Sequence, residues 1–352
     1  MNSTSLQLIG APASPYTRKM LALLRFRRIP YEVRWGDPAT VLTSMGLEVP
    51  KPVLLPTFLF SQEDHKKPFT GNGGAIAVCD STPVIRSLEE SYAQRSVIPP
   101  DPALKFLNYL VEDFADEWGT KYMFHYRWHA QQDIDNAGTL LPLMMDPTLE
   151  SESLKSASSS FIERQTGRLY VVGSTPETAP IIDASYERFL DAMTDVLQQR
   201  SFLFGDRPSA ADFALFGQMS QCVGLDPTPR EITLRKAPRV VAWVHIVEDL
   251  CGLPVANEQW HHRDQVSANL QPLLEEIGRT YIPALLENAR AYSEKRATWS
   301  TTIDGARWEQ KTFPYQVKCL RWIREEFSHL DSDDQAWVRA MLRRAAINGL
   351  VD

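Results

Sequence analysis

The hydroxyl group of Ser14 lies where a protein can stabilise an anion. It follows a short apolar strand, Leu6 to Gly10, and precedes Pro15, which opens an apolar-periodic stretch ending near Arg28. Serine is a favoured N-cap, and proline at the first helical position loses only an amide that has no partner there. The unpaired amides and dipole of a helix N-terminus favour a nearby anion by about 0.3 to 1 kcal/mol. Ser14 is therefore either an anion-stabilising hydroxyl or a simple helix cap.

Asp80 and Ser81 stand at a second expected helix start. The strand Ala75 to Cys79 precedes them, and the run Asp-Ser-Thr-Pro opens a helix that continues through Tyr92. The pattern is that of a capped N-terminus.

A proline interrupts the apolar run Val53 to Phe60. Proline inside a strand indicates an edge position or a special peptide bond. Pro56 is the better candidate for such a bond because a strand continues after it, and Pro52 is the alternative. Cis bonds make up only about 5 to 6% of X-Pro bonds in folded proteins, so an ordinary trans bond at a strand edge is also open.

An unusually aromatic helix is expected over Leu104 to Ala130. Trp118, Tyr122 and Tyr126 follow one another at intervals of one helical turn and share one face, which could overlook a cleft or pack in the core. His125 and His129 are also one turn apart, but no third ligand stands at metalloprotease spacing, so we expect no metal.

The elements that position these residues fall into three parts. Residues 1–98 read as a compact α/β unit, and residues 101–252 as an all-helical unit that includes a Ser209-Asp212 capping box. Residues 253–352 read as an appended helical region with a β-hairpin at Asp304-Gly305. Residues 146–180, rich in serine and threonine, predict a long loop with one or two short helical turns.

Composition excludes several classes of protein. The 352 residues are 43% hydrophobic and carry a net charge of -7, which favours a globular chain and argues against a nucleic-acid partner. The four cysteines form no Cys-x-x-Cys pair, so zinc sites and disulfides are not expected. No signal peptide and no run of about 18 apolar residues is present, so we expect a cytoplasmic protein that does not bind membranes.

Four features, in order over residues 5–252, resemble the cytosolic glutathione transferase superfamily. They are the Ser14-Pro15-Tyr16-Thr17 turn, the Leu55-Pro56 step, the Asp80-Ser81 pair, and the helical half with Ser209-Ala210-Ala211-Asp212. The resemblance implies a serine-type member with a thioredoxin-like domain that binds glutathione as co-substrate. It also implies a helical domain that lines an apolar pocket, and a homodimer. Residues 253–352 lie outside the pattern.

The same resemblance implies a role for each site residue. Ser14 would stabilise the glutathione thiolate, with Tyr16 as a secondary hydroxyl. The Leu55 backbone, turned by a cis bond to Pro56, would pair with the cysteinyl part. Asp80 would meet the ammonium of the γ-glutamyl group, and Ser81 its carboxylate.

The aromatic face of Trp118, Tyr122 and Tyr126 would bind a small hydrophobic electrophile. Redox branches of this fold carry cysteines where this chain has Ser14 and Thr17, so dithiol exchange at the turn is excluded. Two alternatives stay open. One is a non-catalytic binding or scaffold protein, and the other is a glutathione-dependent lyase, isomerase or dehalogenase.

Overall fold

The computed structural model describes residues 5–63, 67–68 and 74–351. Its N-terminal part is a four-stranded mixed sheet in the order β2-β1-β3-β4, in which β1 and β2 run parallel and the other neighbours antiparallel. This is the expected thioredoxin-like arrangement. The strands are β1 Leu6–Gly10, β2 Tyr31–Trp35, β3 Thr57–Ser61 and β4 Ala75–Cys79.

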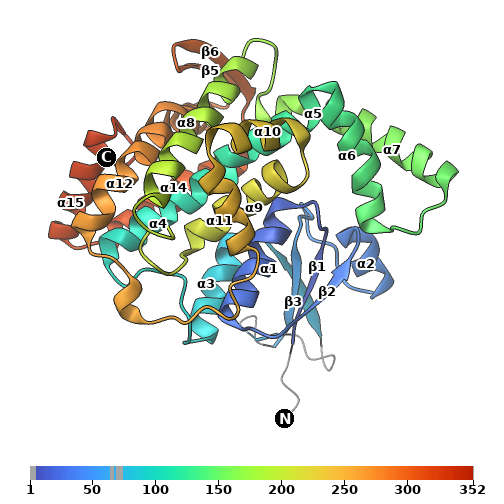
Figure 1. Ribbon diagram of the computed structural model, residues 1–352, viewed down its shortest axis with the longest axis horizontal. Coiled ribbons are helices and arrows are strands. Elements are labelled where there is room, and N and C mark those ends of the chain that lie inside the picture. Colours follow the sequence, from blue (N-terminus) through green and yellow to red (C-terminus); the bar gives the residue numbers. More distant parts are fainter. Residues whose placement is uncertain (1–4, 64–66, 69–73, 352) are drawn as a thin grey trace.

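Helices cover both faces of this sheet (Figure 1). Alternation along the strands separates the two faces, since Leu8 and Phe58 join the main core while Ile9 and Leu59 pack with Leu42 of α2. The helices are α1 Pro15–Arg27, α2 Pro38–Ser44 and α3 Ser81–Ser91.

The helical part is built around α9, which is buried along most of its length and is mainly apolar. The predicted capping box between Ser209 and Asp212 is confirmed. Where the aromatic helix was predicted, α4, a π-helical turn and α5 form one continuous long helix over residues 102–129. The elements are α4 Pro102–Phe114, the π turn Ala115–Gly119, α5 Thr120–His129, α8 Ala179–Leu197, α9 Ala210–Gly224, α10 Pro227–Lys236 and α11 Pro238–Val247.

The loop predicted over residues 146–180 is wrong in its first half. Helices α6 Gln131–Met145 and α7 Ser151–Thr166 form an arm that projects from the body, and a 3-10 turn, Leu169–Val172, follows (Figure 1). Serine-rich composition concealed α7, which has no fully buried residue. A narrow apolar edge that includes Phe161 and Ile162 holds it against its neighbours.

The C-terminal region has the predicted hairpin. Asp304 and Gly305 both have positive φ, 51° and 80°, as the tight two-residue turn between paired strands requires. The elements of this region are the 3-10 turn Asn257–Gln259, α12 Arg263–Glu276, the π turn Ile277–Tyr281, α13 Ile282–Ser293, β5 Thr298–Ile303, β6 Ala306–Lys311, α14 Pro314–Ser328 and α15 Ser332–Arg344.

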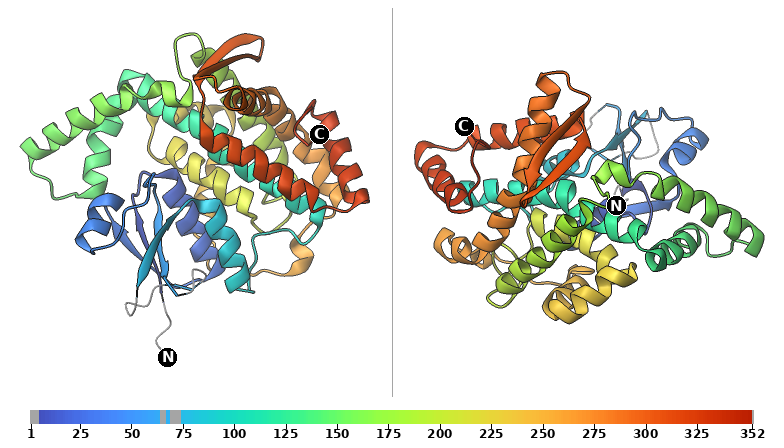
Figure 2. Two further views of the ribbon diagram at one scale, coloured as in Figure 1. Left: turned by 180° about the vertical axis from the view of Figure 1, so that it is seen from behind. Right: turned by 90° about the horizontal axis from the view of Figure 1, so that it is seen from above.

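This C-terminal region shares one continuous core with the rest of the chain. The rings of Trp118 and Trp308 lie 5.2 Å apart between centroids, and those of Phe106 and Phe327 lie 5.6 Å apart. Seen from behind, α14 runs along α4 (Figure 2, left). Within the described residues, none of the helices combines the length and the apolar character that a membrane span needs.

Candidate active site

One edge of the sheet collects the polar residues that the sequence singled out. Ile9, Thr57 and Cys79 stand side by side in the strand register. The carboxyl ends of β1 and β4 therefore meet the start of β3. The residues that follow or precede these positions, Ser14, Leu55-Pro56 and Asp80-Ser81, consequently share this edge.

Ser14 is the N-cap of α1, as predicted. Its Oγ accepts a hydrogen bond from the Thr17 amide at 3.2 Å, and Pro15 occupies the first turn. Accepting this bond uses an oxygen lone pair and leaves the hydroxyl proton for another acceptor. Ser14 is only 9% exposed, so little of its surface is open to solvent.

Tyr16 points to the helical part. Its hydroxyl donates to the backbone carbonyl of Asp116 at 2.7 Å. Burial, together with the Asp116 and Glu117 carboxylates, raises the pKa of Tyr16 well above its ordinary value. The phenol therefore stays protonated and holds α1 against the long helix.

The peptide bond between Leu55 and Pro56 is cis, which confirms the sequence prediction. The bond between Lys51 and Pro52, the alternative position, is cis as well. Pro56 is buried and Leu55 is half-buried.

Asp80 and Ser81 are engaged by other side chains of the chain. Asp80 precedes α3 with a positive φ of 88°, and its side chain makes no capping hydrogen bond of regular geometry. Instead, its Oδ2 accepts a hydrogen bond from the Tyr315 hydroxyl at 2.8 Å. Ser81 Oγ accepts one from Lys19 Nζ at 3.0 Å. Sequence reasoning missed both Tyr315 and Lys19, because neither stands in a motif.

Lys19 ties this edge to the long helix. Its Nζ also lies 2.9 Å from Glu112 Oε1 and 2.6 Å from Asp116 Oδ2, in a fully buried cluster. Burial lowers the pKa of Lys19, but the two carboxylates outweigh that effect and raise it overall. For Asp116, burial dominates over the attraction of Lys19 and raises its pKa to about 6.

Trp118, Tyr122 and Tyr126 lie in the core and not on a cleft wall. They are 0%, 2% and 5% exposed, which corresponds to the packing alternative that the sequence left open. Both Trp118 Nε1 and the Tyr122 hydroxyl bond to Ser185 Oγ, at 3.0 and 2.8 Å. The pocket expectation is corrected for a physical reason: α8 and the β5–β6 hairpin cover this face of the helix.

Arg127 holds the backbone just before Ser14. Its Nη1 donates to the carbonyl of Ala13 at 3.1 Å, and its Nε and Nη2 make a forked contact with Asp226 at 2.9 to 3.1 Å. All of these groups are buried or partly buried. The peptide that leads into Ser14 is therefore fixed from the helical part, a role for which the sequence offered no signal.

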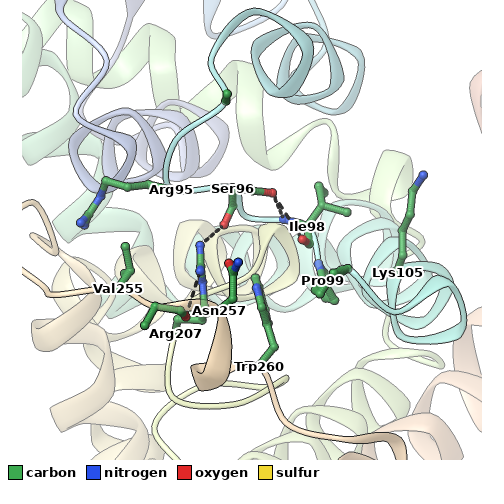
Figure 3. A pocket seen from close by; sticks show the side chains of 12 residues that line it. Arg95, Ser96, Ile98, Pro99, Lys105, Arg207, Val255, Asn257 and Trp260 are labelled. Carbon is green, nitrogen blue, oxygen red and sulfur yellow. Dashed lines mark hydrogen bonds between the residues drawn. The ribbon is translucent and has the colours of Figure 1, made fainter.

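A cavity of about 560 Å³ lies elsewhere (Figure 3). It is lined mainly by residues 93–100, which connect α3 to α4, and by residues 255–260, which follow α11. The Arg207 guanidinium crosses it, donating to the carbonyls of Ser96 at 2.6 Å and Ala256 at 3.2 Å, and stacks 4.7 Å from the Trp260 ring. These contacts join two chain segments. The cavity is separate from the sheet edge that carries Ser14.

Two family models match the chain. The glutathione S-transferase N-terminal domain matches residues 8–96, and the glutathione S-transferase C-terminal domain matches residues 163–245. The chain belongs to the glutathione transferase superfamily. Most of α4 to α7 and everything after α11 lie outside the two glutathione transferase matches.

Solved glutathione transferases are similar over most of the chain. A family member from Pseudomonas fluorescens with two glutathione bound has 14% identity and a TM-score of 0.41, covering 70% of this chain and 88% of its own. One from Methylobacterium radiotolerans, in complex with glutathione sulfonate, has 17% identity and a TM-score of 0.40, covering 76% and 94%. Poplar glutathione transferase F1 has 18% identity and a TM-score of 0.40, covering 76% and 97%. No curated protein matches the chain.

Proposed function

We propose that the protein is a glutathione-dependent transferase in which the Ser14 hydroxyl stabilises the glutathione thiolate for attack on a small hydrophobic electrophile. The observation that carries the proposal is the geometry of Ser14. It caps α1 through its oxygen, so its proton can be donated to a sulfur at the same helix N-terminus. Membership of the superfamily supports glutathione as the co-substrate.

The energies suffice for this role. An unperturbed cysteine thiol titrates near ~8.5, so a useful transferase must lower that pKa. A helix N-terminus contributes about 0.3 to 1 kcal/mol, which is under about one pKa unit at 1.36 kcal/mol per unit. A hydrogen bond to a charged group contributes about 1.5 to 3 kcal/mol, enough for about one or two further units.

The remaining site residues would bind the peptide. We assign the Leu55 backbone to the cysteinyl part, Ser81 to the γ-glutamyl carboxylate and Asp80 to the γ-glutamyl ammonium. Tyr16 serves α1 packing in this proposal and takes no part in the chemistry. A lyase, isomerase or dehalogenase would use the same thiolate and differ in the second substrate. A homodimer and a cytoplasmic location belong to the proposal as well, and sedimentation velocity tests the first.

A non-catalytic glutathione transferase fold is the second candidate, and one observation favours it. The predicted site is partly closed by the chain itself, because Ser14 is only 9% exposed and the Asp80 carboxylate already accepts a hydrogen bond from the Tyr315 hydroxyl. A binding or scaffold protein would tolerate this closure.

The deciding experiment titrates the thiol of bound glutathione by its ultraviolet thiolate absorbance, in the parent, Ser14→Ala and Ser14→Thr. We expect the parent to lower the thiol pKa, Ser14→Ala to lose about one or two units of that shift, and Ser14→Thr to keep it because it retains the hydroxyl. Ser14→Ala also loses a helix cap, about 1 kcal/mol, so its folding is checked by circular dichroism. A parent that binds glutathione without perturbing the thiol would favour the scaffold.

A further inference from the structure

Tyr315 brings the C-terminal region into the proposed site. It lies in the first turn of α14, outside both family matches, yet its hydroxyl donates to Asp80 Oδ2 at 2.8 Å. Asp80 is the residue to which we assign the ammonium group of the ligand.

The position of Tyr315 is held by bonds on both sides. The backbone of Phe313 makes two hydrogen bonds with the buried side chain of Asn288, at 2.9 and 2.7 Å. Gln316 Nε2 donates to Glu117 Oε2 at 3.1 Å. The Tyr315 ring packs edge-on against Trp322, with centroids 6.4 Å apart. The hydroxyl is therefore directed at Asp80 by a preorganised segment and not by a free side chain.

The other charged groups that face Asp80 also compete with an ammonium. Lys19 from α1 and Lys318 from α14 both act on its carboxylate electrostatically. A ligand ammonium would meet a carboxylate that is already bonded to a phenol and is subject to the charges of Lys19 and Lys318, which the Asp116 carboxylate opposes. The attraction that a free aspartate would offer is consequently reduced.

We propose that Tyr315 is a specificity-determining residue. Its hydroxyl donates a hydrogen bond to the Asp80 carboxylate and so weakens the preference of the site for ligands with a free ammonium group. The site therefore also accepts thiol peptides that carry only a carboxylate at the γ-glutamyl end. The inference rests on the proposed function, since it concerns the same glutathione site.

The test compares two ligands on the full chain by isothermal titration calorimetry. Glutathione carries the ammonium, and glutaryl-cysteinylglycine has the same skeleton and carboxylate without it. The parent should bind both ligands with affinities within about threefold, because the ammonium adds little binding free energy when Asp80 is already bonded to Tyr315. Tyr315→Phe loses one hydroxyl and keeps the ring contacts, and it should prefer glutathione by about tenfold, as expected for a bond between charged groups.

Two variants control for indirect effects. Tyr281→Phe removes another tyrosine–carboxylate bond between the C-terminal region and α4, the one to Asp113, and should keep the ratio of the parent. Tyr315→Phe combined with Asp80→Asn should lose the new preference, because the carboxylate is gone. Near-ultraviolet circular dichroism shows whether each variant is folded.

The outcomes separate the inference from the proposed function. Equal ligand ratios in the parent and Tyr315→Phe, or a tenfold preference already present in the parent, overturn the role of Tyr315 while glutathione binding stands. A preference that also appears in Tyr281→Phe overturns it too. No binding of either ligand by any variant overturns the proposed function and the inference with it.

Discussion

The Lys19 side chain positions a residue of the proposed site, Ser81, relative to the long helix. Its ammonium contacts Ser81 of α3, Glu112 of α4 and Asp116 of the π turn. Glu112 and Asp116 are buried, and without the cation both carboxylates would lose their shared ion pair. Glu112 would keep only the hydrogen bond from Thr82 and the attraction of Arg86. An unpaired buried charge is costly, so Lys19 fixes where Ser81 and the start of α3 lie relative to α1.

We therefore expect Lys19→Met to lower the free energy of unfolding by about 3 to 5 kcal/mol. Urea denaturation followed by circular dichroism measures this loss. Adding Glu112→Gln and Asp116→Asn should restore much of it, because the uncompensated charges are removed. Lys155→Met provides the matched control, since the Lys155 side chain is 72% exposed in its pair with Glu152 and should matter little. A Lys19→Met variant as stable as the parent would contradict this account.

At the scale of elements, the π turn Ala115–Gly119 distributes acidic side chains to both sides of the long helix. Asp116 contacts Lys19 of α1, while Glu117 accepts a bond from Gln316 of α14. One turn earlier, Asp113 accepts a bond from the Tyr281 hydroxyl. A π turn rotates the following residues relative to a regular α-helix, so neighbouring carboxylates can serve different partners.

These carboxylates predict a pH-dependent stability. Burial and then the charge of Asp113 raise the pKa of Glu117 to about 8, and burial is also the main cause that raises the pKa of Asp113 to about 7. In the unfolded chain both titrate near ~4, so between about pH 4 and pH 8 the native state holds more protons than the unfolded state. Stability should fall as pH rises, by at most about 1.4 kcal/mol per pH unit for each group.

Glu117→Gln tests this prediction. The amide keeps an oxygen for Gln316 but cannot ionise, so the decline in unfolding free energy between about pH 5 and pH 8 should become shallower. Urea denaturation at several pH values measures the slope. Glu152→Gln, on the exposed side of α7, should leave it unchanged. An identical slope in Glu117→Gln and the parent would rule out Glu117 as its source.

At the scale of the whole molecule, the C-terminal region is part of the body of the protein. Trp308 from the hairpin and Phe327 from α14 pack directly on Trp118 and Phe106 of the long helix. Such contacts bury apolar surface that neither part could bury alone, and the same core cluster reaches from Leu6 to Leu350.

We expect residues 253–351 to unfold together with the helical part. Tryptophan fluorescence and far-ultraviolet circular dichroism should then report coincident denaturation curves. Trp308→Ala should shift both curves together, by about 3 to 5 kcal/mol, because it opens a cavity in the shared core. A separate early transition for the hairpin and α14 would show that the region is an independent unit.

Local signals in the sequence determined the elements around Ser14. The serine-proline pair placed the start of α1, short apolar runs placed β1 and β4, and Asp304-Gly305 placed the hairpin turn. These predictions depend on interactions between residues that are close in the chain, which is why sequence spacing is enough. The helix α7 was not predicted, because its many serines interrupt the apolar pattern and leave only a narrow apolar edge.

Only the tertiary structure decided what the predicted side chains face. Tyr315 lies 235 positions from Asp80, and Lys19 lies 93 positions from Glu112, so no spacing rule connects them. The aromatic face of Trp118, Tyr122 and Tyr126 has the same periodicity whether it lines a pocket or packs in a core. Its role is settled by α8, whose Tyr186 packs on Tyr122 and Tyr126, and by the hairpin, whose Trp308 packs on Trp118. Burial depends on which distant segment covers a surface and not on the surface itself.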